Sequence, residues 1–132
     1  MPTQNVWEAA FTGNVRDVHR AVDAGAEPDA LDKSGLTALH KAAMNGHIQC
    51  MEALVERGWD VNKADSSGCT ALHIAAKSGQ MDAVKWLVDQ GVDIRVKSKK
   101  GNTARRMASN SGNMDIHTYL NDLELTKFGS VI

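Results

Sequence analysis

Glycine recurs along this chain of 132 residues at a spacing of 33 residues. Four glycines, at positions 13, 46, 79 and 112, form one series with this period. Two shorter series, at 25, 58 and 91 and at 35, 68 and 101, repeat the period in other registers. Three series with one period predict stacked structural repeats, each of which packs mainly against its neighbours.

The second and third repeats are alike over their full length. Residues 32–46 read DKSGLTALHKAAMNG and residues 65–79 read DSSGCTALHIAAKSG. Paired alanines in both segments predict a first helix with a small-sided face, against which a neighbouring repeat can pack closely. A second helix follows, with apolar residues at i, i+3, i+6 and i+7. These residues are Ile48, Met51, Leu54 and Val55 in one repeat and Met81, Val84, Leu87 and Val88 in the next.

Two residue types mark the ends of these helices. Gly46 and Gly79 stand between the first and second helices, where a left-handed residue ends the first one. Thr37 and Thr70 stand just before the first helix, where a hydroxyl can cap it. The repeated glycines and threonines therefore have folding roles.

The segments GLTALH at 35–40 and GCTALH at 68–73 resemble the ankyrin-repeat family. The family's usual proline after the threonine is alanine here, at 38 and 71, and alanine also suits the first turn of a helix. The resemblance covers residues 3–122. It implies an all-α solenoid of four repeats, each with a short β-hairpin-like turn and two antiparallel helices. We expect repeats at 3–31, 32–64, 65–97 and 98–122 within a domain at 1–125, followed by a C-terminal tail at 126–132.

The terminal repeats differ from the central ones and are expected to act as caps. In the first repeat Trp7 takes the place of His40, and we expect it to shield the open N-terminal end. In the fourth repeat Arg105 and Arg106 replace Leu-His, and His117 replaces a buried apolar residue. Polar residues at stacking positions predict a complete protein of four repeats.

Composition narrows the possible functions. The 15 basic and 16 acidic residues are nearly balanced, which argues against nucleic-acid binding through the overall field. No apolar run reaches the roughly 18 residues of a membrane span, and the N-terminus lacks the pattern of a secretion signal. Cys50 and Cys69 have no framework spacing, so we expect no disulfide and a reducing compartment, the cytoplasm or nucleus. We expect the protein alone to be a monomer.

The histidines do not form a pattern typical of catalysis or metal binding. His40 and His73 lie one repeat apart, on the order of 10 Å, too far for two ligands of one zinc ion. The resemblance implies that these imidazoles bond nearby backbone and threonine groups. No histidine has a ligand spacing with a cysteine, and no phosphate-binding glycine loop occurs. We therefore expect no catalytic residue, no metal and no cofactor, and no enzymatic activity.

The resemblance implies that a partner protein binds at the turn tips and the exposed face of the first helices. We therefore interpret the chain as an adaptor or inhibitor that binds through this concave groove. Phe11, Leu36 and Met44 are apolar at positions expected to face solvent, which suits contact residues, although single exposed apolar residues are also normal. The full predicted set is Phe11, Lys33, Ser34, Leu36, Met44, Asn45, Ser66, Ser67, Cys69, Lys77, Ser78, Lys99, Lys100, Asn102 and Asn110.

A basic segment suggests a second function. Six cations fall within twelve positions on a turn and the start of a helix, and we call them the basic lobe. The lobe could receive an acidic peptide, a phosphorylated segment or a lipid headgroup at a membrane surface, or it could simply keep the end of the solenoid soluble. Its residues are Arg95, Lys97, Lys99, Lys100, Arg105 and Arg106.

Two short segments suggest further sites. The sequence around Asn62 resembles that of asparagines hydroxylated in some ankyrin repeats, although asparagine is also ordinary in such a turn. The residues Ser130, Val131 and Ile132 resemble a C-terminal ligand of PDZ domains, provided that Ile132 is the native end.

Overall fold

The computed structural model describes residues 5–128, with side chains up to residue 126. This part of the chain forms eight helices and no strand, which confirms the all-α fold class. The helices follow one another in pairs, one pair per repeat. They are α1 (Val6–Thr12), α2 (Val15–Asp23), α3 (Ala38–Met44), α4 (Ile48–Glu56), α5 (Ala71–Ser78), α6 (Met81–Asp89), α7 (Ala104–Asn110) and α8 (Met114–Phe128).

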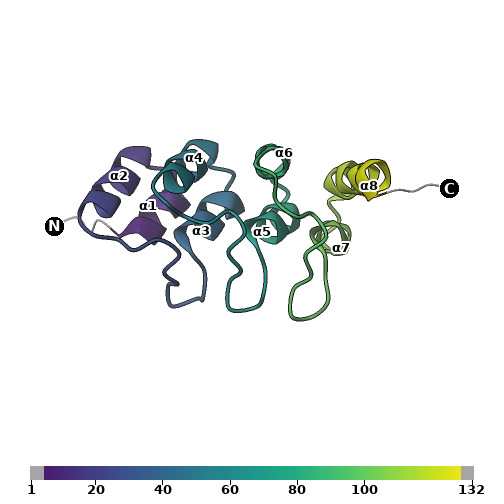
Figure 1. Ribbon diagram of the computed structural model, residues 1–132, viewed down its shortest axis with the longest axis horizontal. Coiled ribbons are helices and arrows are strands. Elements are labelled where there is room, and N and C mark those ends of the chain that lie inside the picture. Colours follow the sequence, from purple (N-terminus) through teal and green to yellow (C-terminus); the bar gives the residue numbers. More distant parts are fainter. Residues whose placement is uncertain (1–4, 129–132) are drawn as a thin grey trace.

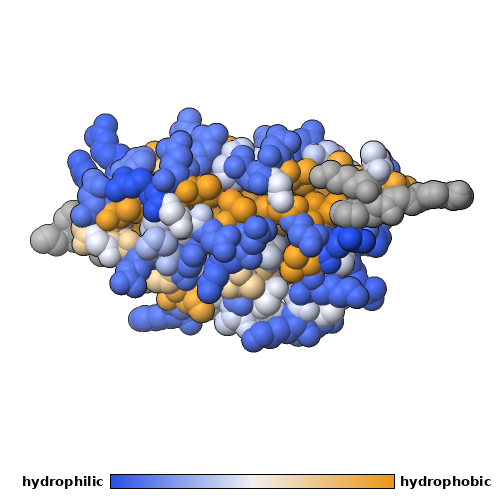
Figure 2. Space-filling model, viewed as in Figure 1, coloured by the Kyte–Doolittle hydropathy of each residue, from blue (hydrophilic) through white to orange (hydrophobic). Residues whose placement is uncertain are grey.

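The helices form two layers. The first helices α1, α3, α5 and α7 stack side by side in one row, and the second helices α2, α4, α6 and α8 form a row beside them (Figure 1). The turns before α3, α5 and α7 project from the row of first helices, away from the second helices (Figure 1). Hydrophobic residues gather between the two rows, while hydrophilic residues cover most of the outer helices and of the turns (Figure 2).

The repeated small and apolar residues form the core. The alanine pairs at 42–43 and 75–76 are fully buried, so the first helices approach closely. Met51 and Leu54 of α4 and their counterparts Val84 and Leu87 of α6 are also fully buried. The predicted apolar face of the second helices is therefore the face that packs inward.

Glycine is required between the two helices of a repeat. Gly13 ends α1 with a φ of 84°, in the left-handed region that the sequence predicts. A side chain there would also collide with the next repeat, because an added Cβ would lie 2.7 Å from Nδ1 of His47. Gly46 meets the side chain of Gln80 in the same way. The glycine series thus follows from the chain conformation and from the close approach of successive repeats.

The final helix is longer than the repeat pattern predicts. α8 continues to Phe128, beyond the expected repeat end at residue 122 and the domain boundary at residue 125. Ile116 and Leu120 are its fully buried residues. Arg105 of α7, which stands where the inner repeats have leucine, forms an ion pair with Glu124 of α8 at 3.0 Å. In the fourth repeat, the polar residue at the position of this leucine is therefore paired with a charge on the extended helix of the same repeat.

Core and surface positions should differ sharply in their effect on stability. Leu72→Ala removes a side chain that is 2% exposed, and we expect it to lower the free energy of unfolding by roughly 2–5 kcal/mol. The exposed Lys99 is the matched surface position, and Lys99→Ala should change the free energy of unfolding by less than about 0.5 kcal/mol. Urea denaturation measures both values, and the reverse order would contradict this assignment of core and surface.

Candidate functional site

The turns that precede α3, α5 and α7 present the candidate surface, and each is a short hairpin without a strand. At the first turn the N–H of Asp32 donates to the carbonyl of Leu36 at 2.9 Å. A carboxylate oxygen of Asp32 also accepts hydrogen bonds from the N–H groups of Ser34 and Leu36. Asp65 repeats this arrangement with Ser67 and Cys69. The first two turns are therefore fixed by their own aspartate side chains. In the third turn Ser98 takes this position, and its hydroxyl accepts a hydrogen bond from the Asn102 N–H.

Threonine and histidine connect each turn to its neighbours. The hydroxyl of Thr37 caps α3 and contacts Nδ1 of His40 at 2.6 Å. Nδ1 accepts a hydrogen bond from the Thr37 N–H, so Nε2 carries the proton and donates to the carbonyl of Cys69 in the next turn at 2.8 Å. His73 makes the same bond to the carbonyl of Asn102 at 2.9 Å. The bonds to threonine and backbone that the resemblance implied for these histidines are confirmed.

Direct backbone hydrogen bonds also join the turns to one another. The Ser66 N–H donates to the carbonyl of Gly35, and the Lys99 N–H donates to the carbonyl of Ser67, both at 3.0 Å. Successive turn tips are thereby held in a row. Side chains in this row can meet a partner without a large loss of backbone entropy.

Most of the predicted contact residues lie on the accessible surface. The side chains of the turn tips, the ends of the first helices and the exposed apolar residue of α1 are open to solvent, whereas those of Leu36, Met44 and Asn102 are half-buried. The exposed residues are Phe11, Lys33, Ser34, Asn45, Ser66, Ser67, Lys77, Ser78, Lys99, Lys100 and Asn110.

The expectation that Cys69 is exposed is wrong, because this residue is only 7% exposed, and its contact with a partner stays a prediction. Leu36, at the equivalent position one repeat earlier, is half-buried where exposure was expected. The reason is the same in both turns. The aspartate at the start of the turn binds the N–H of this residue and holds it at the base of the turn, beside the buried threonine cap.

A cavity of about 550 Å³ opens at the first-repeat end of the groove, between α1, the first turn and α3. Phe11 and Leu31 line it and are 41% and 44% exposed. Trp7 forms another wall, and its indole N–H donates to the carbonyl of Ala30 at 3.0 Å. Trp7 therefore lines the groove, and its bond to the following turn parallels that of the histidine it replaces.

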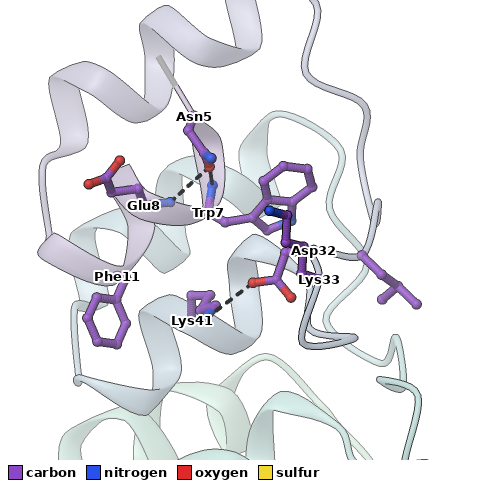
Figure 3. A pocket seen from close by; sticks show the side chains of 8 residues that line it. Asn5, Trp7, Glu8, Phe11, Asp32, Lys33 and Lys41 are labelled. Atoms are coloured by element: carbon purple, nitrogen blue, oxygen red, sulfur yellow. Dashed lines mark hydrogen bonds and ion pairs between the residues drawn. The ribbon is translucent and has the colours of Figure 1, made fainter. Parts of the chain in front are cut away.

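Charged side chains complete this cavity (Figure 3). Lys41 lies between Asp32 and Phe11, with its amino group 3.3 Å from the carboxylate and 5.4 Å from the centre of the ring. Burial alone would raise the pKa of Asp32, but hydrogen bonds from Leu36 and Ser34 and the contact with Lys41 bring it below its ordinary value. Asp32 is thus a carboxylate at neutral pH, and the Lys41 ammonium is held beside the aromatic ring.

Sequence reasoning identified Phe11 and Lys33 in this cavity and missed Trp7, Leu31 and Lys41 as its walls. Signals for two of them were present. Leu31 is a large apolar residue where the next two repeats have Ala64 and Lys97, and Lys41 differs from Ile74 at the same position of the next repeat.

A second cavity, of about 400 Å³, lies beside the basic lobe. Lys97, Arg105 and Arg106 line it together with His117. Among the lobe residues, Arg105 is half-buried and engaged with Glu124, while the others are exposed. The lobe is therefore a cationic surface in which the charge of Arg105 is already neutralised.

The predicted modification site and the two cysteines line neither of these two cavities. Asn62 is exposed, and its backbone N–H donates a hydrogen bond to the side chain of Asp60. Hydroxylation of Asn62 stays a prediction. The proposed PDZ ligand, Ser130 to Ile132, lies outside the described residues. Burial raises the pKa of the Cys50 thiol to about 11 and also raises that of Cys69, which keeps both thiols protonated.

Among the described residues, no group of three or more His, Cys, Asp or Glu side chains is placed to hold a metal ion. None of the described helices combines the length and hydropathy needed to cross a bilayer.

The family follows from comparison with known proteins. A family model described as ankyrin repeats, in three copies, matches residues 6–98. The chain belongs to the ankyrin-repeat family. A search of curated proteins gives no match. Ankyrin repeats generally mediate protein–protein interaction and are typically not enzymes. The fourth ankyrin-type helix pair, α7 and α8, lies beyond the matched residues but stacks on the third in the same way.

The buried histidines of these ankyrin repeats should make stability depend on pH. Burial lowers the pKa of His40 and of His73 below the ordinary value of 6.5, although their hydrogen bonds to carbonyls oppose the shift. The unfolded chain therefore binds more protons than the folded one below that pH. The folded protein keeps its full stability with respect to these histidines above pH 6.5. Below pH 6.5 the free energy of unfolding should fall, by at most about 1.4 kcal/mol per pH unit for each histidine.

Urea denaturation between about pH 7 and pH 5 measures this dependence, with the double variant His40→Gln/His73→Gln as the control. The variant should be less stable than the wild type at neutral pH, because it loses the links between turns. Its stability should also change less with pH. If wild type and variant lost stability in parallel over this range, the two histidines would not be its source.

Proposed function

We propose that this protein is a non-enzymatic adaptor or inhibitor that binds another protein through its concave groove and turn tips. The supporting observation is the row of turn tips, whose side chains are exposed while their backbones are bonded to one another. Ser34, Ser67 and Lys100 illustrate this, since each is exposed on a turn that its neighbours hold in place. Such a row offers contacts along several repeats at little entropic cost.

The cavity beside α1 adds to this support. Interfaces typically depend on a few aromatic or aliphatic anchors in well-packed pockets. Phe11, Leu31 and Trp7 provide an apolar lining of this kind at one end of the groove. We place the function in the cytoplasm or nucleus, which agrees with two buried free cysteines, Cys50 and Cys69.

The basic lobe supports a second candidate function, the binding of an anionic ligand or membrane surface. The observation in its favour is the second cavity, where Lys97 and Arg106 are exposed beside His117. The ion pair between Arg105 and Glu124 reduces the charge available there. The groove therefore remains the first candidate.

Affinity capture from a cell lysate, followed by mass spectrometry, tests the groove. The groove variant is Phe11→Ala/Lys33→Ala/Lys77→Ala, which changes three exposed side chains. We expect it to retain at most about a tenth of the specific partner, because contact residues of this kind each contribute about 1 kcal/mol or more.

A matched control variant changes one apolar and two basic residues of the outer helices, Arg16→Ala/Lys85→Ala/Leu125→Ala. All three are exposed, and the control should capture the partner as the wild type does. Circular dichroism must show that both variants are folded. A partner kept by the groove variant but lost by Lys97→Ala would reject the groove in favour of the basic lobe.

A further inference from the structure

Charge is divided between the two helix layers, although the chain as a whole is nearly neutral. The first helices α1, α3, α5 and α7 carry four basic residues and one acidic residue. The second helices α2, α4, α6 and α8 carry four basic residues and nine acidic ones. The layer that forms the groove is therefore positive, and the outer layer is negative.

The turn tips strengthen this division. Lys33, Lys99 and Lys100 are exposed on the tips, whereas Asp32 and Asp65 are half-buried and bind backbone N–H groups. Some cations are neutralised, since Lys41 pairs with Asp32 and Arg105 with Glu124. Five exposed cations of the groove layer make no ion pair within residues 5–128, namely Lys33, Lys77, Lys99, Lys100 and Arg106.

An apolar anchoring site accompanies these charges at one end of the groove. Phe11, Leu31, Met114 and Leu125 are the exposed large hydrophobic residues of the described chain, and the first two line the same cavity. The cavity is preorganised, because the indole of Trp7 is bonded to the Ala30 carbonyl. Figure 3 shows Phe11 and Trp7 on either side of Lys41.

The spacing of these features defines the length of a matching ligand. Packed helices lie about 10 Å apart, so Lys77 is roughly 20 Å along the groove from Phe11, two repeats earlier. An extended chain advances about 3.3 Å per residue, which corresponds to roughly six residues. The tip residues Lys99 and Lys100 lie a further repeat away, about three residues more.

We infer that the groove binds an acidic linear segment of its partner, which places one large apolar side chain in the cavity between Phe11 and Leu31. The carboxylates of that segment then face the lysines of the third and fourth repeats. This inference rests on the proposed function and adds the chemistry of the partner. The negative outer layer repels the same segment, so the charge division also directs it to the groove.

Selection from a display library of random peptides of about 12 residues, a length that spans the groove, tests this inference without a known partner. We expect the enriched peptides to combine several Asp or Glu residues with one large apolar residue. Their affinity should fall when NaCl is raised from about 0.05 M to about 0.5 M, because exposed ion pairs are screened by salt.

Two pairs of variants locate the binding. Lys77→Glu/Lys99→Glu should weaken binding of an enriched peptide roughly tenfold or more, whereas Arg16→Glu/Lys85→Glu on the outer helices should change it less than about twofold. Phe11→Ser should weaken binding strongly, and Leu125→Ser, at an exposed apolar position of the outer helix α8, should not. Fluorescence anisotropy with a labelled peptide measures all four.

Three results would overturn the inference: no enrichment, enriched peptides without an acidic excess, or equal losses in the groove and outer variants. None of these results would reject the proposed function, which is judged by capture of the partner protein. A groove that captures a protein but selects no acidic peptide would refute the inferred chemistry alone. A partner kept by the groove alanine variant would instead refute the proposed function.

Discussion

A single hydrogen bond, from the imidazole Nε2 of one repeat to a backbone carbonyl of the next, organises the surface that we propose for binding. His40 and His73 make this bond, and both use Nδ1 to join the threonine that caps their helix. The His40 bond is buried and the His73 bond is partly buried. Loss of one partner of the buried bond would leave a polar group unpaired, at a cost of about 1–3 kcal/mol. The starts of α3 and α5 are thereby tied to the turns that follow these repeats.

This link explains why a chain with short helices can present a firm surface. The first helices have only seven or eight residues and would be marginal in isolation. Close packing through the alanine pairs and capping by Thr37 and Thr70 stabilise them. The aspartate-fixed turns then extend from this layer, and their backbone bonds to one another keep the tips in register.

The sequence predicts the parts of the fold that repeat. Helix order, the buried faces of α4 and α6 and the glycine positions all follow from the 33-residue period, because equivalent residues have equivalent surroundings. The errors lie where a side-chain contact decides between neighbouring positions. Cys69 was assigned to the exposed tip, but the carboxylate of Asp65 holds it at the base of the turn.

The cavity beside α1 was harder to predict because its walls do not repeat. Trp7 and Leu31 come from segments far apart in the chain, and each departs from the residue that the central repeats have at that position. The division of charge between the layers is readable from the sequence only after each helix is assigned to its row. To predict either feature, one must know which residues lie on the same face of the solenoid.

Lysine footprinting tests the central claim, that the concave groove is the binding surface. The chain carries native reporters on both sides, with Lys33, Lys77 and Lys99 in the groove and Lys85 on the outer helix α6, all exposed. Acetylation of each lysine would be measured by mass spectrometry with and without a captured partner. The account predicts that the partner slows modification of the groove lysines and leaves Lys85 unchanged. Protection of Lys85 with unaltered groove lysines would contradict it.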